Sequence, residues 1–345
     1  MSDREQHGLR GPIKACVVVK TRAAFTDAQG KSRPENKFED TREYDLEGRM
    51  TAERHSSSGG SEGVMQTTNV YDSSGRKLKW IYSPARKDEP AAETVYSYDD
   101  DGRLLKITDS RRPENPIVFH YDEPGRKIMV QVFRPEDYRP NTAVAGSPFD
   151  RASHPNLEGG GTSTGIFDEH DRPTEIQVSN AQGELLYRAV RIYDAQGRII
   201  EEKQLWEDPV GVFPAEVRAK MSEPSSESEQ LREKLRTLFS DSVSYSYDAE
   251  GHLKQEHRRV ANQEMETETT YNQYGDKASE IRRSTKPPIN SSGAAGIPEW
   301  TYSEARYSYK YDDHGNWIEQ ASSNRSSPDG TFSSPTVVKR TLTYY

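Results

Sequence analysis

The sequence contains one cysteine, no long apolar run and few aliphatic residues. The single cysteine, Cys16, excludes an internal disulfide framework and a cysteine-based zinc site. No stretch of roughly 18 apolar residues is present, so no transmembrane helix is expected. The first ten residues are polar, and we therefore expect no signal peptide in this chain.

The low aliphatic content raises the question of disorder. Leu, Ile, Val and Phe make up about 16% of the 345 residues, below the ~20% under which disorder becomes a serious alternative. However, the net charge is only −9, and 19 Tyr and four Trp supply further apolar area. We therefore predict an ordered but thin sheet with much wetted surface. The mild acidity, with a pI near 5.5, argues against nucleic acid and anionic membranes as partners.

A six-residue pattern, Y-D-x-x-G-R, recurs along most of the chain, and Tyr98–Arg103 is its clearest copy. Most neighbouring copies are 23 to 27 residues apart, which suits two strands with a tip and a return turn. Longer steps contain insertions. The nine copies begin at Tyr44, Tyr71, Tyr98, Tyr121, Phe167, Tyr193, Tyr247, Tyr271 and Tyr311.

The chemistry of the pattern predicts a β-hairpin tip. Asp99 suits the first position of a type I turn, where its carboxylate accepts hydrogen bonds from nearby backbone N–H groups. Gly102 suits the left-handed position that closes a three-residue hairpin loop. We expect Tyr98 to end the incoming strand with its hydroxyl near water. An exposed Arg103–Asp99 ion pair contributes only ~0–1 kcal/mol, so the turn geometry sets the pattern.

The repeated Y-D-x-x-G-R pattern resembles the YD (RHS) repeats of bacterial Rhs proteins, toxin-complex shells and teneurins. The resemblance covers roughly residues 40 to 345. It implies hairpins that wind into a long twisted sheet, which often closes into a hollow shell around a passenger. The same repeat serves different proteins, so the resemblance indicates a fold more strongly than a function.

The expected fold is all-β, with antiparallel hairpins arranged in one twisted or wrapped sheet and one short helical insertion. Residues 1–10 are expected to be disordered, and residues 11–345 to form a single YD-repeat β-domain. Insertions are expected at about 134–165, 207–240 and 284–300, the first of them flexible and at an edge or end of the sheet. Strands are expected at 13–20 and 337–345.

One insertion has a helical pattern. Ser226 and Glu229 match a capping box, and Leu231 and Leu235 follow at helical spacing. We expect a helix over about 227–240, and residues 215–221 are a further candidate. The helix either covers a face or edge of the sheet or binds a partner.

No catalytic, cofactor-binding or metal site is predicted, and the chain is not expected to be an enzyme. None of the eight His has zinc-type spacing to another His or Cys, and no Gly-x-Ser-x-Gly elbow is present. The glycine-rich run at 159–165 lacks the Gly-Lys-Ser/Thr ending of a phosphate loop. Paired carboxylates occur in most tips, where the turn itself requires the Asp, so they give no specific support for a glycosidase.

The remaining site-like feature is a set of tyrosine rows with period-two spacing, which places each row on one sheet face. Such rows can stack sugars or bind peptides, or they can simply supply a lean sheet with apolar area. The candidate binding residues are Tyr96, Tyr98, Tyr245, Tyr247, Tyr307, Tyr309 and Tyr311.

Three functions follow from these patterns. The first is a non-catalytic structural or binding module that recognises carbohydrate or protein at the bacterial envelope or exterior, a location suspected from the family resemblance. The second is a shell fragment or partner of an Rhs-type toxin system. The third is an enzyme of unknown type. No cofactor, nucleic acid or membrane insertion is expected, and the sequence does not indicate an oligomeric state.

Overall fold

The computed structural model of the protein describes most of the chain. The described residues are 2–22, 25–26, 32–33, 35–58, 63–86, 88–122, 126–137, 147–157, 159–210, 226–260, 263–286 and 299–345. Within them, 20 strands form a single sheet in which every pair is antiparallel, and two short strands form a separate pair.

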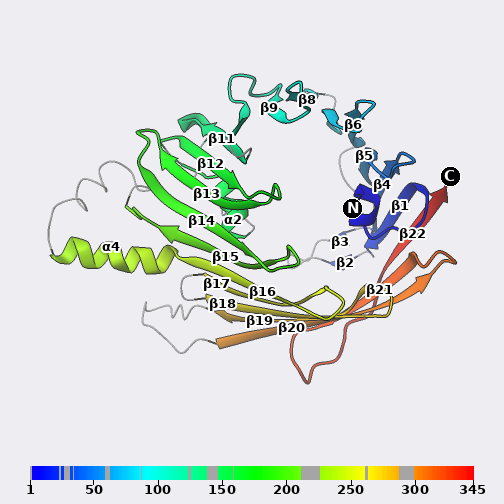
Figure 1. Ribbon diagram of the computed structural model, residues 1–345. Coiled ribbons are helices and arrows are strands. Elements are labelled where there is room, and N and C mark those ends of the chain that lie inside the picture. The colour runs from blue at the N-terminus through cyan, green and yellow to red at the C-terminus, as the bar shows by residue number, and fades with distance from the viewer. Residues whose placement is uncertain are drawn as a thin grey trace.

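The sheet is a meander, with each strand from β4 onward pairing with the next one along the chain (Figure 1). Its strands are β1 (Ile13–Arg22), β4 (Asn36–Tyr44), β5 (Met50–Ser57), β6 (Met65–Tyr71), β7 (Lys77–Ser83), β8 (Ala92–Tyr98), β9 (Leu104–Asp109), β10 (Ile117–Tyr121), β11 (Lys127–Phe133), β12 (Gly161–Phe167), β13 (Pro173–Asn180), β14 (Leu185–Tyr193), β15 (Ile199–Trp206), β16 (Asp241–Tyr247), β17 (Leu253–Val260), β18 (Gln263–Tyr271), β19 (Lys277–Lys286), β20 (Glu299–Tyr311), β21 (Trp317–Arg325) and β22 (Thr336–Tyr344). The separate pair is β2 (Phe25–Thr26) and β3 (Ser32–Arg33).

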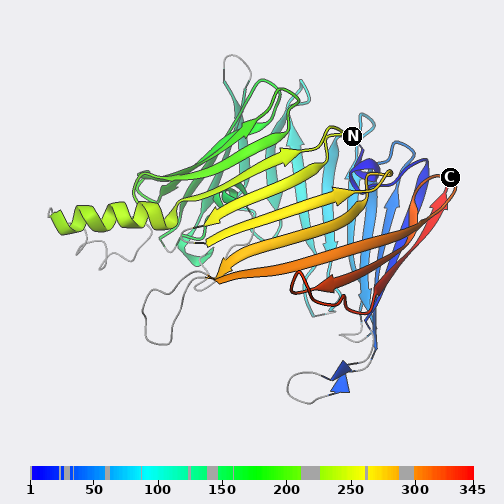
Figure 2. The same ribbon diagram turned by 90° about the horizontal axis from the view of Figure 1, so that it is seen from below.

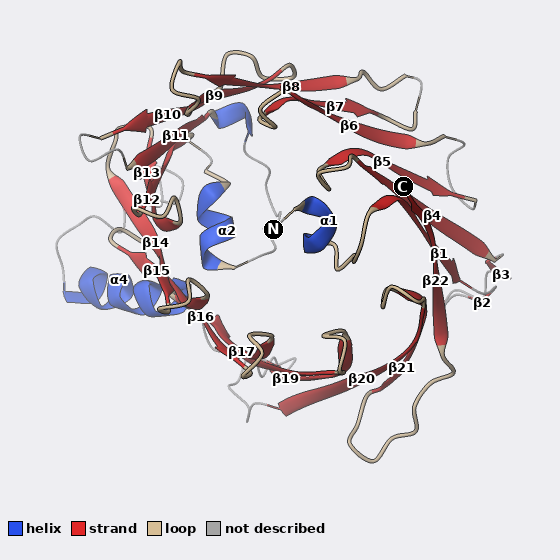
Figure 3. Cartoon of the chain, turned by 45° about the vertical axis from the view of Figure 1, so that its right-hand side comes forward, coloured by secondary structure: helices blue, strands red, loops and turns tan. Residues whose placement is uncertain are grey.

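The first strand closes this sheet into a ring. β1 lies between the last strand and β4, with Cys16 opposite Leu342 on one side and opposite Arg42 on the other. Figure 3 shows the closed outline. The all-β prediction is confirmed, whereas the sheet is a closed 20-strand barrel and not an open twisted one. Closure removes the two exposed edges that an open sheet presents to other chains.

All nine predicted tips are turns of one design. In each, the backbone N–H of the second residue donates to the carbonyl of the sixth at 2.9 to 3.1 Å. The side chain of the second residue accepts in return from the N–H of the sixth, as Asp99 does from Arg103 at 2.7 Å. In the tips whose glycine is described, that glycine is left-handed, with φ +81° at Gly102. In the tip that begins at Phe167, Asp171 stands in place of the glycine and adopts the same left-handed conformation, with φ +60°, so the turn is retained.

The tyrosine hydroxyls of the tips form hydrogen bonds with the protein. This differs from the expectation that they point to water. Tyr98 donates to the carbonyl of Lys77, two residues beyond the glycine of the preceding tip, at 2.8 Å. The tips that begin at Tyr71, Tyr121, Tyr193, Tyr247 and Tyr271 make the equivalent bond. Each bond therefore joins one hairpin to the hairpin before it.

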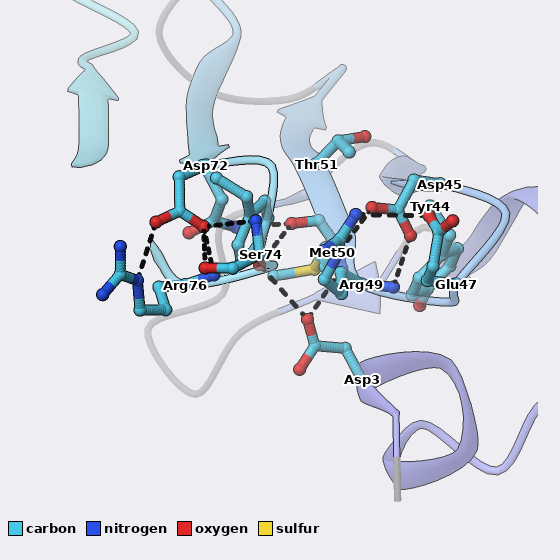
Figure 4. Close-up of polar contacts among 12 residues, drawn as sticks. Asp3, Tyr44, Asp45, Glu47, Arg49, Met50, Thr51, Asp72, Ser74 and Arg76 are labelled. Carbon is cyan, nitrogen blue, oxygen red and sulfur yellow. Dashed lines mark hydrogen bonds and ion pairs between the residues drawn. The ribbon is translucent and has the colours of Figure 1, made fainter. Parts of the chain in front are cut away.

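The arginine of each preceding tip adds a second contact to the same tyrosine. The Arg76 guanidinium lies over the Tyr98 ring, 5.0 Å from its centre, while it also pairs with Asp72 (Figure 4). Equivalent pairs are Arg49–Tyr71, Arg103–Tyr121, Arg172–Tyr193 and Arg198–Tyr247. We call the hydroxyl–carbonyl bond and the arginine–ring contact together the tip contact. It makes the six-residue pattern an element of sheet assembly as well as a turn.

At the closing strand, residues near the two ends of the chain make the contacts that a tip makes elsewhere. Tyr344 donates to Asp312 of the ninth tip, and its ring lies 4.4 Å from that of His314. From the other end, the Arg10 side chain donates to the carbonyl of Gly315 and lies over the Tyr274 ring. Both chain ends are thus attached to the rim at the seam, and the predicted final strand is confirmed as β22.

Residues 134–165 differ from the flexible edge insertion that we expected. They contain η1 (Pro135–Asp137), α2 (Pro148–Ser153) and the start of β12. A capping box between Ser147 and Asp150 starts α2, which lies inside the ring (Figure 3). There Phe149 and Ala152 pack on Ile176 and other apolar residues of the inner face and form one core cluster. Burial of this apolar surface orders the helix.

The N-terminal residues differ from the expected disorder as well. Asp3–Gln6 form α1, which a capping box between Ser2 and Glu5 begins. The Asp3 carboxylate accepts from the backbone N–H of Met50 at 2.7 Å (Figure 4). Leu9 and Ile13 follow and are buried in a second core cluster with Cys16 and Tyr44.

The predicted helix of the 207–240 insertion is confirmed as α4 (Ser226–Phe239). It contacts β15 and projects away from the ring (Figure 2). The candidate helix at 215–221 and most of the 284–300 insertion lie outside the described residues.

The tip contact predicts a specific loss of stability. Tyr98→Phe removes only the hydroxyl that bonds Lys77, so we expect the free energy of unfolding to fall by about 1 kcal/mol. Tyr307→Phe is the matched control, because the Tyr307 hydroxyl bonds no described residue. Denaturant titration measures both, and equal losses in the two variants would contradict the assigned role of the bond.

Ring closure predicts a cross-link between the first and last strands. Leu342→Cys places a second thiol opposite Cys16 on the same sheet face, so mild oxidation is expected to form an intramolecular disulfide. Thr341→Cys is the control, because its side chain lies on the other face. Intact-mass analysis detects the loss of two hydrogens, and free thiols in oxidised L342C would refute the closed register.

Candidate functional site

The inner face of the ring is the candidate functional site, and strand register defines it. Residues directly opposite in an antiparallel pair share a face. The face that packs on α2 therefore runs without a break through every strand pair around the ring. All three predicted tyrosine rows lie on it: Tyr96 is opposite Ile107, Tyr245 opposite Glu256, and Tyr307 opposite Ser322.

Five of the seven predicted tyrosines are held by hydrogen bonds to the protein. Tyr98 and Tyr247 make tip contacts, and Tyr309 donates to the Lys277 carbonyl at 2.8 Å in place of the expected tip tyrosine. The Tyr311 hydroxyl lies 2.9 Å from the Asp276 carboxylate, and burial, together with this carboxylate, raises the pKa of Tyr311 to about 12. Tyr245 donates to Glu202 at 3.1 Å. These rings are therefore fixed parts of the wall.

Tyr96 and Tyr307 are different. Their rings are half-buried on the inner face, and neither hydroxyl forms a hydrogen bond with any described residue. Burial raises the pKa of Tyr96, so its hydroxyl stays protonated at neutral pH. Of the predicted binding residues, these two have a ring and a hydroxyl available to a ligand.

Two buried ion-pair clusters hold α2 against the wall. Glu202, whose relative exposure is 1%, pairs with Arg191 at 2.6 Å, and the Arg191 guanidinium stacks over Phe149 at 4.0 Å. Asp241 pairs with Arg151 of α2 and, at 3.3 Å, with Arg258. Because each of these charges has an oppositely charged partner, these clusters are structural anchors and not a reactive site.

The structure adds polar residues that the tyrosine pattern did not reveal. A pocket of about 520 Å³ is formed mainly by inward-facing side chains of β17 to β20, among them Glu256, Thr267, Glu280 and Arg282. A second pocket, of about 550 Å³, lies at the rim between the tips at Tyr98, Tyr121 and Phe167. Period-two alternation carried across the repeats identifies the inward-facing residues, but only the strand register shows which of them are neighbours.

One group of metal-ligating side chains occurs among the described residues, at the tip where histidine replaces arginine. The ligand atoms of Asp248, Glu250 and His252 lie within 4.8 Å of one another. His252 Nδ1 is 3.2 Å from Asp248, and its ring stacks on Tyr271 at 4.7 Å. The imidazole thus takes the place of the tip arginine, and this structural role accounts for the grouping.

The carboxylates of two tip residues, Asp72 and Asp168, are held in their ionised form. Hydrogen bonds from Ser74 and Arg76 keep the pKa of Asp72 far below its usual range. The hydrogen bond from Arg172 lowers the pKa of Asp168 to about 2. These side chains act in the turns and are not free to serve as general acids near neutral pH.

Comparisons with known proteins give limited guidance. No family model and no curated protein sequence matches the chain. Among solved structures, the chain is similar to a porin-like protein from Bacteroides uniformis, with 10% identity, 97% of this chain and 98% of that chain covered, and a TM-score of 0.33. The chain shares 12% identity with a TcdB2-TccC3 structure, with 90% of this chain and 16% of that chain covered and a TM-score of 0.29. With the Photorhabdus luminescens Tc holotoxin pore it shares 13% identity, with 87% of this chain and 18% of that chain covered and a TM-score of 0.24.

These TM-scores are below 0.5, so the closed sheet is established by its own strand pairings and not by these similarities. The chain spans less than a fifth of each of the two toxin chains. Within the part of the chain that the structure describes, no helix is long and apolar enough to cross a membrane.

The lowered carboxylate pKa values predict acid sensitivity. The folded-state pKa of Asp168 lies below its unfolded value of about 3.9, so its contribution to stability is complete above that value and is lost as pH falls toward 2. We expect the melting temperature to fall between pH 4 and pH 2, and to fall less steeply in Asp168→Asn. Scanning fluorimetry measures the melting temperature of both proteins across this pH range. Asp101→Asn is the control, because it makes the same change in charge. Identical pH profiles in wild type and D168N would contradict the assignment.

Proposed function

We propose that the protein is a non-catalytic YD-repeat binding module that holds a carbohydrate or protein of the bacterial envelope or exterior against its inner face. The observation that carries this proposal is the register that brings all three tyrosine rows onto one concave surface. Nine copies of one turn, and five tip contacts between neighbouring hairpins, support membership of the YD-repeat class.

The distribution of hydrogen bonds favours a binding role. Most row tyrosines bond to the wall and give it rigidity. The hydroxyls of Tyr96 and Tyr307 bond to none of the described residues, and their rings are half-buried. Aromatic rings with a free polar group suit the alternating apolar and polar surfaces of sugars and peptides. A rigid wall lowers the entropy cost of binding, because few side chains must be ordered.

An enzyme is the weaker alternative. Within the described residues, the buried carboxylates Glu202 and Asp241 are paired with arginines, and the tip carboxylates are used in turns. A catalytic acid or base needs a proton that it can exchange near the working pH. The residues on the inner face are therefore better suited to hold a ligand than to transform it.

A second candidate is a shell element or partner in an Rhs-type toxin system. Closure of the sheet favours it, since a closed wall surrounds its contents. α1 and α2 lie within the outline and occupy part of the interior (Figure 3). The bound material distinguishes the two candidates, because a shell element retains a protein and a glycan-binding module retains polysaccharide.

Retention of material from a bacterial envelope fraction tests the proposal. Immobilised wild type is expected to retain polysaccharide or one protein saturably, and Tyr307→Ala is expected to reduce retention several-fold. Ser308→Ala is the matched control, because it changes the next residue of β20, whose side chain lies on the outer face. No saturable retention, or equal loss in the two variants, would refute an inner-face binding role; retention of a single protein would favour the second candidate.

A further inference from the structure

The inner-face pocket between β17 and β20 has the features of a built binding site. Its volume of about 520 Å³ lies within the roughly 300–1,000 Å³ of small-ligand sites. Register places Glu256, Thr267, Arg282 and Ser303 side by side across four strands, since each lies directly opposite the next. The pocket therefore belongs to the rigid wall and not to a loop.

The charges of the pocket cancel. Glu280, which is largely buried, accepts hydrogen bonds from Lys277 and Arg282, each at 2.6 Å. Burial raises the pKa of Glu280, but the hydrogen bonds and charges of Lys277 and Arg282 lower it by more, so the carboxylate is ionised. The carboxylate of Glu256 balances the second cation of this group. A neutral lining gives no net attraction to a polyanion or a polycation.

Several polar groups of the pocket have capacity left for a ligand. The Glu256 carboxylate and the Thr267 hydroxyl are half-buried neighbours, and neither forms a hydrogen bond or ion pair with any described residue. Arg282 uses one N–H toward Glu280 and has four more donors. The pocket thus offers a carboxylate as acceptor, a hydroxyl and the several N–H donors of a guanidinium.

These features suit a sugar better than a peptide. Neighbouring hydroxyls of a sugar donate to a carboxylate and accept from a guanidinium, which are strong charge-assisted hydrogen bonds. A peptide strand commonly binds by adding to a sheet edge, and the closed ring has none here. The lining is also poor in apolar side chains, with Leu253 and Met265 as its aliphatic members.

We propose that this pocket binds an uncharged carbohydrate through the Glu256 carboxylate, the Thr267 hydroxyl and the Arg282 guanidinium. The proposal deepens the proposed function, on which it rests, because it names the ligand class and assigns residues outside the tyrosine rows. Glu280 is the positioning residue, since its ion pair fixes the direction of Arg282.

Titration calorimetry with defined probes tests the assignment. The neutral probes are β-linked tetrasaccharides of glucose and of N-acetylglucosamine, and the neutral oligosaccharide fraction of a bacterial envelope. A heparin tetrasaccharide and tetralysine serve as charged probes. At least one neutral probe is expected to bind saturably and more tightly than either charged probe.

Two near-isosteric variants locate the binding. Glu256→Gln and Thr267→Val are each expected to raise the Kd about tenfold, the effect of losing one good hydrogen bond. Glu268→Gln is the matched control, because Glu268 is on β18 with its side chain on the outer face. Melting temperatures of all variants verify that they fold.

The outcomes separate this inference from the proposed function. Failure of every neutral probe, tighter binding of a charged probe, or unchanged Kd values in folded E256Q and T267V would each overturn the pocket assignment. The envelope retention assay with Tyr307→Ala stands independently of these results. If retention is saturable while the pocket variants change nothing, the binding module remains and its ligand lies elsewhere on the inner face.

Discussion

The bond from a tip tyrosine to the carbonyl of the preceding hairpin is the interaction on which the rest of the ring depends. Together with the arginine of the preceding tip over the same ring, it fixes the spacing of neighbouring hairpins at the rim. A single bond of this kind contributes about 1 kcal/mol. Its repetition around the rim gives a sheet with few aliphatic residues a consistent register.

This arrangement explains how so polar a chain folds. Apolar burial is concentrated in two clusters where α1 and α2 meet the wall, around Leu9 and Phe149. Elsewhere the wall depends on ladder hydrogen bonds, tip contacts and matched ion pairs such as Arg42–Glu53. The inner face consequently remains polar and accessible to water, which a fully apolar core would not allow.

The sequence predicted the elements of this fold better than their assembly. Turn chemistry at Tyr98–Arg103 and its copies identified all nine tips, and the capping box at Ser226 identified α4. These signals are local, so they can be read without the fold. Ring closure depends on Cys16 pairing with residues at both 42 and 342, which no local pattern contains. The neighbouring positions of Glu256 and Thr267 were missed for the same reason, because this adjacency exists only after the strands pair.

The helix α2 shows a related limit. Residues 134–165 are rich in Pro, Gly and Ser, a composition that indicates a loop, yet Phe149 and Arg151 anchor a short helix inside the ring. Three or four well-placed contacts outweighed the average propensity of the segment. At Phe167, which has no hydroxyl, Lys127 lies over the ring at 4.2 Å in place of the usual arginine, so the cation–ring part of the tip contact tolerates substitution when another cation is nearby.

The position of β1 has a consequence for the order of assembly. This strand is synthesised before the other strands of the ring, and it can pair with β4 early, but its other edge stays unpaired until β22 has been made. Nearly the whole chain separates the two partners, so the last pairing is slow compared with the local hairpins. During that interval the nascent sheet has two open edges, which makes neighbouring copies on a polysome competitors for the closing strand.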